Sequence, residues 1–532
     1  MSKIKKYQRA IVLTLAMAIL TAYIARTAWL SDDAMITIRS VLMLNNGHGP
    51  VTTIGIRAQS FTHPLWFLLL SIVTRGTHEY IYSVIIFNVV VAATAYFLVV
   101  RNLKKNLSIT IFVCLLLSSR TIIDYSTSGL ENALSSLLLI MLFLVLKKAP
   151  RNQVLYFVSI CSLLIMTRID FVVFLIPLVF YFFRKTSHIR AKSLIVGMSP
   201  LFLWYTFSLV YYGTILPNTA YTKLNLNVSK RVLSGFGLKY LYESSKYDLF
   251  IVIFLAALFI FLVYSLLKKS FGFQFFISVG IAMYIIYIVS IGGDFMAGRL
   301  LSPFMFLFIV IVLFSVDSNN ELILKNRSFN VMKISTGLAI VIVLLTLSTS
   351  WMYILSSDEN VLANNQLVGD ERSFYALRGQ SIFLRQSEFS IPQDVDYLTY
   401  KELFNLNGKI PNDGYLLYET SKAISNNEKY TALPLKSCRG LNLLLNPYKT
   451  HVIDHCGLID PILSRTPVVV DINHFRPGHY LRTVDEAYDI YKEINKPQYH
   501  EIKLLTTGKL FTTKRLGFIA KNFFSNDLKL LI

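Results

Sequence analysis

Continuous apolar runs, each about 15 to 20 residues long, recur along the first two thirds of this chain and constrain its fold more than any other feature. A run of that length suffices for a helix to cross a bilayer, and a soluble domain would not expose so much apolar sequence. A closed β-barrel would instead show short segments of alternating polarity. With 54% hydrophobic and 16% charged residues among 532, the chain is predicted to be a polytopic α-helical membrane protein.

Short basic clusters separate the apolar runs and indicate the direction of each span. Positive charge is enriched in cytoplasmic turns, and each cluster lies about two spans from the next. We therefore expect a cytoplasmic N-terminus, a retained first anchor, about eleven spans and an outer C-terminus in a bacterial cytoplasmic membrane. The expected spans are residues 10–30, 80–100, 107–120, 131–147, 153–167, 170–184, 193–212, 249–267, 273–291, 301–316 and 334–355.

One apolar run, residues 65–73, is too short to cross about 30 Å of hydrocarbon at about 1.5 Å per residue. We expect it to form an interfacial helix, paired with a second amphipathic helix at about residues 34–44. Both juxtamembrane helices belong to the first outer loop, between the spans expected at residues 10–30 and 80–100. Counting residues 65–73 as a span would invert every later turn.

The formal net charge of +21 does not indicate a nucleic-acid partner. About 20 of the 31 acidic and about 21 of the 52 basic residues lie beyond Ser356, so the last third is nearly neutral. The excess positive charge sits in short turns of the membrane part, as the positive-inside bias predicts. We expect a transmembrane module over residues 1–356 and a soluble outer domain of mixed α/β type over residues 357–532.

Acidic residues of the membrane part fall mainly on one face of this topology. Carboxylates near hydrocarbon are costly and usually functional or paired, so that outer face is the candidate site. Only Asp317 and Glu321 are expected on the cytoplasmic side. The outer acids are Asp32, Asp33, Glu79, Asp124, Glu131, Asp170, Glu243, Asp248 and Asp294.

The adjacent acids Asp32 and Asp33 follow the first apolar run directly. One could act as a general base while the other orients the acceptor, holds a divalent metal or raises its neighbour's pKa. The alternative is that they merely cap the helix that begins near Ala34. Arg39, two helical turns after Asp32, either binds a phosphate or neutralises these acids.

The stretch GGDFMAGR at residues 292–299 ends a predicted span. Its glycines could let a ligand approach the backbone, and Arg299 could bind a phosphate. The alternative is a salt bridge between Asp294 and Arg299 that closes a turn. At outer helix ends, Arg168 is a further candidate for binding the donor phosphate and Glu131 a candidate for acceptor binding or support.

Four further residues are weaker candidates. His63 is either a donor-binding or a structural histidine. Lys223 lies in a basic loop predicted to face outside, so either the topology slips there or the loop meets an anionic partner such as a lipid phosphate. Asp460 and His479 flank turn glycines in the outer domain, without a compact zinc-ligand spacing. The chain has no Walker loop, dinucleotide fingerprint or nucleophile elbow, which disfavours ATP-driven transport.

The four cysteines divide between the two parts of the chain. Cys114 and Cys161 lie inside predicted spans, where an apolar structural role is the default. Cys438 and Cys456 both belong to the predicted outer domain, and two cysteines that close in sequence outside the cytoplasm are a candidate disulfide.

Several stretches, in order, carry a family resemblance: DDAMITIRSVLMLNNGHG, FTHPLW, SGLEN, TRID, YYGTILPNTAYTK, GGDFMAGRLLSP, DHCGLID and RPGHY. Together they resemble the bacterial arabinofuranosyltransferases of the GT-C glycosyltransferase superfamily, of the type that adds terminal arabinofuranose from a polyprenyl-phosphate donor. The resemblance implies two juxtamembrane helices, a multispan bundle, a soluble outer domain and an inverting transfer with an Asp of the first outer loop as base. Asp32 and Asp33 occupy that position, with Asp32 expected as the base. Residues 55–60, GIRAQS, differ from the acidic stretch of the family.

The leading hypothesis is a glycosyltransferase that moves a pentose from a polyprenyl phosphate to an envelope glycan or a protein such as a pilin. The alternative is a lipid-linked sugar flippase or other transporter, which should place acids and helix breaks near the bilayer midplane. A structural subunit of an envelope complex would leave the paired acids without a task.

Overall fold

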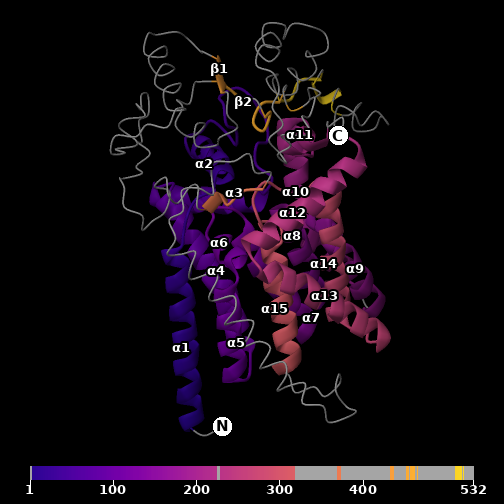
Figure 1. Cartoon of the computed structure of the whole chain (residues 1–532). Helices are drawn as coiled ribbons and strands as arrows, with labels where there is room; N and C mark the ends of the chain where they lie inside the picture. Colours follow the sequence, from indigo (N-terminus) through magenta and orange to yellow (C-terminus); the bar gives the residue numbers. More distant parts are fainter. Residues whose placement is uncertain are drawn as a thin grey trace, which may run out of the picture.

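The structure, a computed structural model, describes residues 3–187, 189–224 and 228–317, and then residues 368–372, 432–435, 451–454, 456–461, 464, 510–513, 515–517 and 519. The described chain is mostly α-helical (Figure 1). Its helices are α1 (Lys3–Arg26), α2 (Asp32–Asn45), α3 (Pro64–Thr77), α4 (Tyr82–Asn102), α5 (Asn106–Ser118), α6 (Arg120–Asp124), α7 (Asn132–Lys148), α8 (Gln153–Thr167), α9 (Phe171–Lys185), α10 (Ala191–Tyr212), α11 (Asn218–Leu224), α12 (Lys230–Tyr247), α13 (Phe250–Leu267), α14 (Phe273–Ser290) and α15 (Ser302–Asp317). Two strands, β1 (Ala432–Leu435) and β2 (His451–Asp454), pair in parallel.

Five helices are long and apolar enough to cross a membrane: Tyr7–Arg26 within α1, α4, α10, α13 and α14. Large apolar side chains cover their exposed faces, for example Phe202 at 72% and Phe259 at 68% exposure. Such faces are poorly solvated by water and are well matched to lipid chains. The chain is therefore a helical membrane protein.

Other predicted spans form shorter helices. α5, α8 and α15 are apolar but have 13, 15 and 16 residues, and the expected span at residues 334–355 lies outside the described residues. A count of about eleven spans therefore stays a prediction. The two expected juxtamembrane helices are present as α2 and α3, which pack against each other. With 14 residues, α3 reaches only about 21 Å at 1.5 Å per residue.

α15 lies at the centre of the bundle, and most of its side chains are buried. It contacts α5, α7 and α13, while α8 packs against α10 and α9 against α14. α15 begins at Ser302, directly after the loop that carries Arg299, and ends at Asp317. The helix thus connects the two ends of the bundle.

α1 begins at the end of the bundle that also carries the turn between α4 and α5 (Figure 1). Arg9 donates to the carbonyl oxygen of Leu103. The Asp317 carboxylate accepts from the backbone N–H groups of Lys104 and Lys105 at 2.6 and 2.9 Å. Asp317, an acid expected at this end, therefore binds backbone amides at the start of α5.

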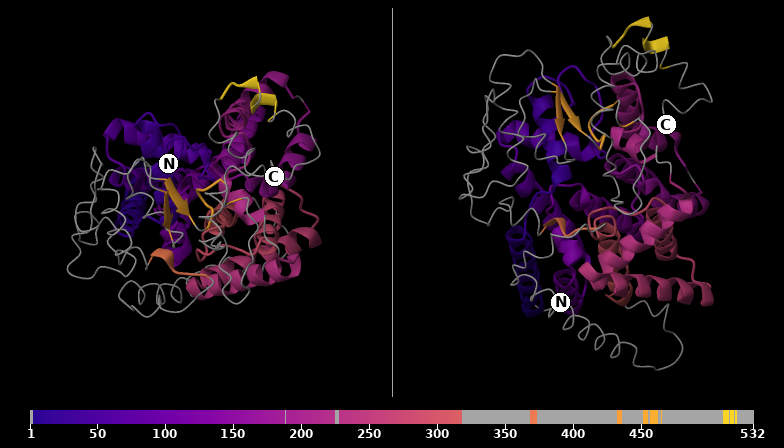
Figure 2. Two further views of the ribbon diagram at one scale, coloured as in Figure 1. Left: turned by 90° about the horizontal axis from the view of Figure 1, so that it is seen from above. Right: turned by 45° about the horizontal axis from the view of Figure 1, so that its top comes forward.

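Segments from the last third of the chain lie over the opposite end, which carries α2 (Figures 1 and 2). Ile36 of α2 packs with Cys456, Leu458 and Ile459, and Gly369 forms a bridge with Met296. The expected domain boundary near residue 356 lies outside the described residues. The α/β character of the outer domain also stays a prediction, because only short pieces of residues 357–532 are described, among them β1, β2 and a few helical residues near 515.

Candidate functional site

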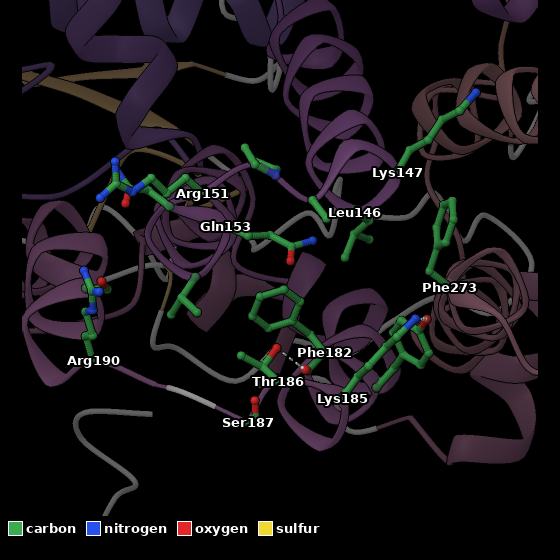
Figure 3. A pocket seen from close by; sticks show the side chains of 16 residues that line it. Leu146, Lys147, Arg151, Gln153, Phe182, Lys185, Thr186, Ser187, Arg190 and Phe273 are labelled. Atoms are coloured by element: carbon green, nitrogen blue, oxygen red, sulfur yellow. Dashed lines mark hydrogen bonds between the residues drawn. The ribbon is translucent and has the colours of Figure 1, made fainter.

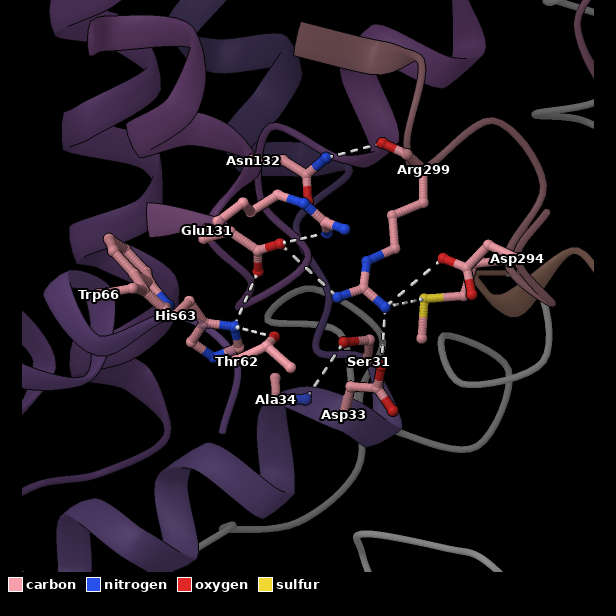
Figure 4. Close-up of polar contacts among 12 residues, drawn as sticks. Ser31, Asp33, Ala34, Thr62, His63, Trp66, Glu131, Asn132, Asp294 and Arg299 are labelled. Carbon is pink, nitrogen blue, oxygen red and sulfur yellow. Dashed lines mark hydrogen bonds and ion pairs between the residues drawn. The ribbon is translucent and has the colours of Figure 1, made fainter. Parts of the chain in front are cut away.

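Arg299 and Asp33 form an ion pair at the end of the bundle that carries α2 (Figure 4). Arg299 Nη1 lies 2.7 Å from Asp33 Oδ2, and the Arg299 side chain is 7% exposed against 24% for Asp33. Arg299 also lies 3.7 Å from Asp294 Oδ2 and 3.7 Å from Glu131 Oε1. The expected Asp294–Arg299 pair is thus present, but Asp33 is the nearer partner.

Burial by itself would lower the pKa of the Arg299 guanidinium, but the carboxylates of Glu131, Asp294 and Asp33 raise it above its ordinary value. The guanidinium is therefore charged at any physiological pH. Its Nε, buried, has no hydrogen-bond partner among the described residues.

Ser31, and neither aspartate, caps α2. The Ser31 hydroxyl accepts from Ala34 N at 3.4 Å, which places Asp32 and Asp33 in the first turn of the helix. The capping role considered from sequence for the two acids is therefore wrong. Carboxylates in the first turn still interact favourably with the positive end of the helix dipole. Asp32 is 4% exposed.

Two glycines of the loop before Arg299 lie against neighbouring helices. Gly293 and Gly298 have φ values of 79° and 73°, which other residues rarely adopt. A Cβ at Gly293 would overlap Tyr240 of α12, and one at Gly298 would lie 2.6 Å from Thr121 Oγ1 of α6. Gly293 and Gly298 thus permit a close approach to neighbouring helices, and the approach of a ligand to this loop stays a prediction.

Glu131 is fully buried and joins three cationic or ionisable partners. Its Oε1 accepts from Arg168 Nη1 at 2.9 Å, and its Oε2 lies 3.1 Å from His63 Nδ1. The third partner is Arg299. Glu131 is therefore a structural centre of the cluster. Without its negative charge, the buried guanidinium groups of Arg168 and Arg299 would each lose a carboxylate partner.

Arg168 forms a two-point contact with Asp170, with Nε and Nη2 donating to the two carboxylate oxygens at 3.0 and 2.6 Å. Tyr284 of α14 donates to the same carboxylate at 3.1 Å. Burial lowers the pKa of Arg168, but Asp170 and Glu131 raise it well above its ordinary value. Arg168, expected to bind a donor, is thus engaged by acids on two sides.

His63 is 3% exposed and is enclosed on both ring nitrogens. Nε2 lies 2.8 Å from Thr37 Oγ1 of α2, opposite the contact with Glu131. This geometry favours the structural role over donor binding, because the ring links α2 to the Glu131 centre.

The remaining predicted residues lie further from the Arg299–Asp33 pair. Arg39 is buried, and its Nε donates to the Thr52 carbonyl at 3.2 Å. Lys223 is exposed on α11. Asp460 is 1% exposed, and its carbonyl accepts from Asn218.

Cys456 is disulfide-bonded, whereas Cys114 and Cys161 are free thiols. Cys438 and His479 lie outside the described residues. The Cys438–Cys456 pairing stays a prediction.

A second buried charge network lies beside the first and was not found from sequence. Arg120 lies 3.2 Å from Asp124 and also pairs with Asp370, while Arg372 lies 3.4 Å from Asp124. The backbone of Gly369 exchanges hydrogen bonds with the loop before Arg299 at 2.8 and 3.1 Å. In the sequence, Asp124 stood only among the outer acids, and Arg120 was a single arginine at the end of an apolar run.

Two asparagines were also missed as site residues. Asn132 Nδ2 donates to the Arg299 carbonyl at 2.8 Å, which holds the loop that presents the guanidinium. Asn218 Nδ2 donates to the carbonyls of Gly457, Leu458 and Asp460. Both lie in stretches that carried the family resemblance, but neither stands out by residue type.

The described residues contain no group of three or more His, Cys, Asp or Glu side chains placed to hold a metal ion. The positive charge beside Asp33 comes from Arg299. With a guanidinium between them, these carboxylates fit a divalent cation less well than a site of several unpaired carboxylates would.

Comparison with family models, with curated proteins and with solved structures found no match for this chain.

Proposed function

We propose that this chain is a membrane glycosyltransferase that takes a sugar from a polyprenyl-phosphate donor and transfers it to an acceptor hydroxyl with inversion. The observation that supports the proposal most is the Arg299–Asp33 pair, in which a charged guanidinium meets a first-turn carboxylate at one end of an apolar bundle. A lipid-linked substrate would reach such a site from the bilayer. The sugar proposed from the resemblance is arabinofuranose or a related pentose.

The donor needs a group that stabilises its phosphate as the glycosidic bond breaks. Arginine provides a planar fork suited to phosphate oxygens. Arg299 has the required charge, and its Nε has no hydrogen-bond partner among the described residues. We assign Arg299 to the donor phosphate.

A phosphate is a good leaving group and needs little general-acid catalysis. The main proton transfer is therefore from the acceptor hydroxyl, which needs a general base. We assign the base to Asp32, the first of the two acids, as the family resemblance implies, and we assign the holding of Arg299 to Asp33. In the step, the acceptor oxygen bonds to the anomeric carbon, the bond from that carbon to the phosphate oxygen breaks, and the acceptor proton goes to Asp32.

The acids of the site support an enzyme over a transporter. Glu131 precedes α7, Asp294 lies in the loop between α14 and α15, and Asp33 lies in the first turn of α2. A transporter would place its charges near the middle of broken helices. The acceptor is proposed to be an envelope glycan or a protein on the outer side of a bacterial cytoplasmic membrane.

The test is transfer by the purified full-length chain with synthetic polyprenyl-phosphoryl pentoses. We expect sugar in an acceptor product of inverted anomeric configuration and release of polyprenyl phosphate. Movement of the intact lipid-linked sugar across a vesicle membrane, without cleavage, would support the flippase instead.

A further inference from the structure

A pocket of about 640 Å³ lies at the other end of the bundle, away from the Arg299–Asp33 pair. It is formed at the turn between α7 and α8, the turn between α9 and α10, and the start of α14. The pocket and the Arg299–Asp33 pair lie at opposite ends of the same helices. α7 starts beside Glu131 and α9 beside Asp170, and the pocket lies where both helices end.

The lining of this pocket carries positive charge without any carboxylate. Arg151, Lys185 and Arg190 line it together with Lys147, and no Asp or Glu is among the lining residues. Figure 3 shows Arg151 and Arg190 on one side of the pocket and Lys185 on another. Within the described part of the chain, neither arginine forms an ion pair.

The pocket also offers groups that suit a phosphate ester attached to an apolar body. The hydroxyls of Ser187 and Ser193 also line it. Phe182 and Phe273 supply aromatic surface (Figure 3). Lys185 donates to Tyr181 at 3.3 Å and so stays at the wall.

Exposed apolar side chains adjoin the pocket along the same helices. Phe180, two residues before Phe182, is 55% exposed, and Ile195, two residues after Ser193, is 70% exposed. In a membrane protein these surfaces meet acyl chains, so a ligand at the pocket has lipid beside it. Basic pockets between spanning helices are a recurring way to bind anionic lipid head groups.

We propose that this pocket binds the phosphate head group of an anionic membrane lipid. Arg151 and Arg190 contact the phosphate oxygens, and the serine hydroxyls donate to them. The inference is independent of the proposed sugar transfer, because it involves no residue of the Arg299 cluster.

The alternative is that basic turns here only follow the positive-inside bias and attract any anionic surface. The chain offers a matched control in Lys268 and Lys269, which are exposed at the α13–α14 turn on the same end but do not line the pocket. Replacing Arg151 and Arg190 by Gln, or replacing Lys268 and Lys269 by Gln, removes two positive charges from the same end of the bundle.

The experiment titrates the full-length protein in detergent with cardiolipin, with phosphatidylcholine and with inorganic phosphate, and counts bound molecules by native mass spectrometry. We expect saturable binding of cardiolipin, weakened roughly 30-fold by the Arg151→Gln/Arg190→Gln double variant and unchanged by Lys268→Gln/Lys269→Gln. Equal weakening in both variants would overturn the proposal. Binding of inorganic phosphate as strong as that of cardiolipin would overturn the assignment to a lipid.

Two further measurements keep the test decisive if the Gln variant does not fold. The Arg151→Lys/Arg190→Lys variant keeps the charge and should retain most binding. Wild-type protein should lose cardiolipin as salt rises, because partly exposed charges are screened. If the wild-type protein binds phosphatidylcholine as strongly as cardiolipin, the proposal is contradicted, and this comparison needs no variant.

Discussion

Arg299 donates from Nη1 to Asp33 Oδ2 at 2.7 Å, across 266 residues of sequence. The contact joins the first turn of α2 to the loop before α15, and Asn132 and Gly369 hold that loop from two other sides. A charged guanidinium and a carboxylate are thereby fixed beside an apolar bundle. The proposed chemistry depends on this pair.

Arg299→Lys should weaken use of the donor while the protein stays folded. The substitution keeps a positive charge beside Asp33 but removes the planar fork that contacts two phosphate oxygens. We expect kcat/KM for the lipid-linked sugar to fall roughly tenfold or more. The control is Arg184→Lys, an exposed residue at the far end of α9. Equal activity of both variants would favour a purely structural Arg299–Asp33 pair.

Glu131→Gln should destabilise the fold, because it removes the charge that Arg168, His63 and Arg299 share in a fully buried position. Breaking a buried ion pair on one side costs on the order of 3 kcal/mol. Thermal unfolding in detergent should show a melting temperature lower by several degrees. Glu243→Gln, which removes an exposed partner of Lys246, should leave the melting temperature unchanged. If both variants melt like the wild type, Glu131 is not the centre of the cluster.

Asn218→Ala should loosen the segment at residues 456–461. The Asn218 amide donates to three carbonyls of that segment, and its oxygen accepts from Ser464 at 2.8 Å. Hydrogen exchange of residues 456–464 should therefore rise markedly. Thr222→Val, which removes one hydrogen bond to Gly457, should have a smaller effect. Unchanged exchange in the Asn218 variant would contradict this role.

Cys456 should be found linked to Cys438 by mass spectrometry of protein purified without reductant. Cys456 is disulfide-bonded, and a loop of that size adds on the order of 3 kcal/mol in the chain-entropy model. Cys114 and Cys161 should be free. A peptide in which Cys456 is joined to any other cysteine would show that the sequence-based pairing is wrong.

The sequence predicts the class of fold and the juxtamembrane helices because lipid burial imposes a continuous apolar pattern on each helix. It also gathers Asp33, Asp294 and Arg299 on one face, since charges beside hydrocarbon must sit at helix ends. It does not predict that Gly293 and Gly298 serve helix packing, because a glycine's neighbour is set by tertiary contacts. The same reason hides Arg120, whose partner Asp370 is 250 residues away.

The most direct test of the proposed function compares Asp32→Asn with Asp33→Asn in a transfer assay with a polyprenyl-phosphoryl pentose. Asp32→Asn keeps the shape of the side chain and removes the proton acceptor, so turnover should fall on the order of 10² to 10⁴ while the donor still binds. Asp33→Asn releases Arg299, so donor binding and turnover should both weaken. Wild-type turnover in both variants would contradict a role for these carboxylates in sugar transfer.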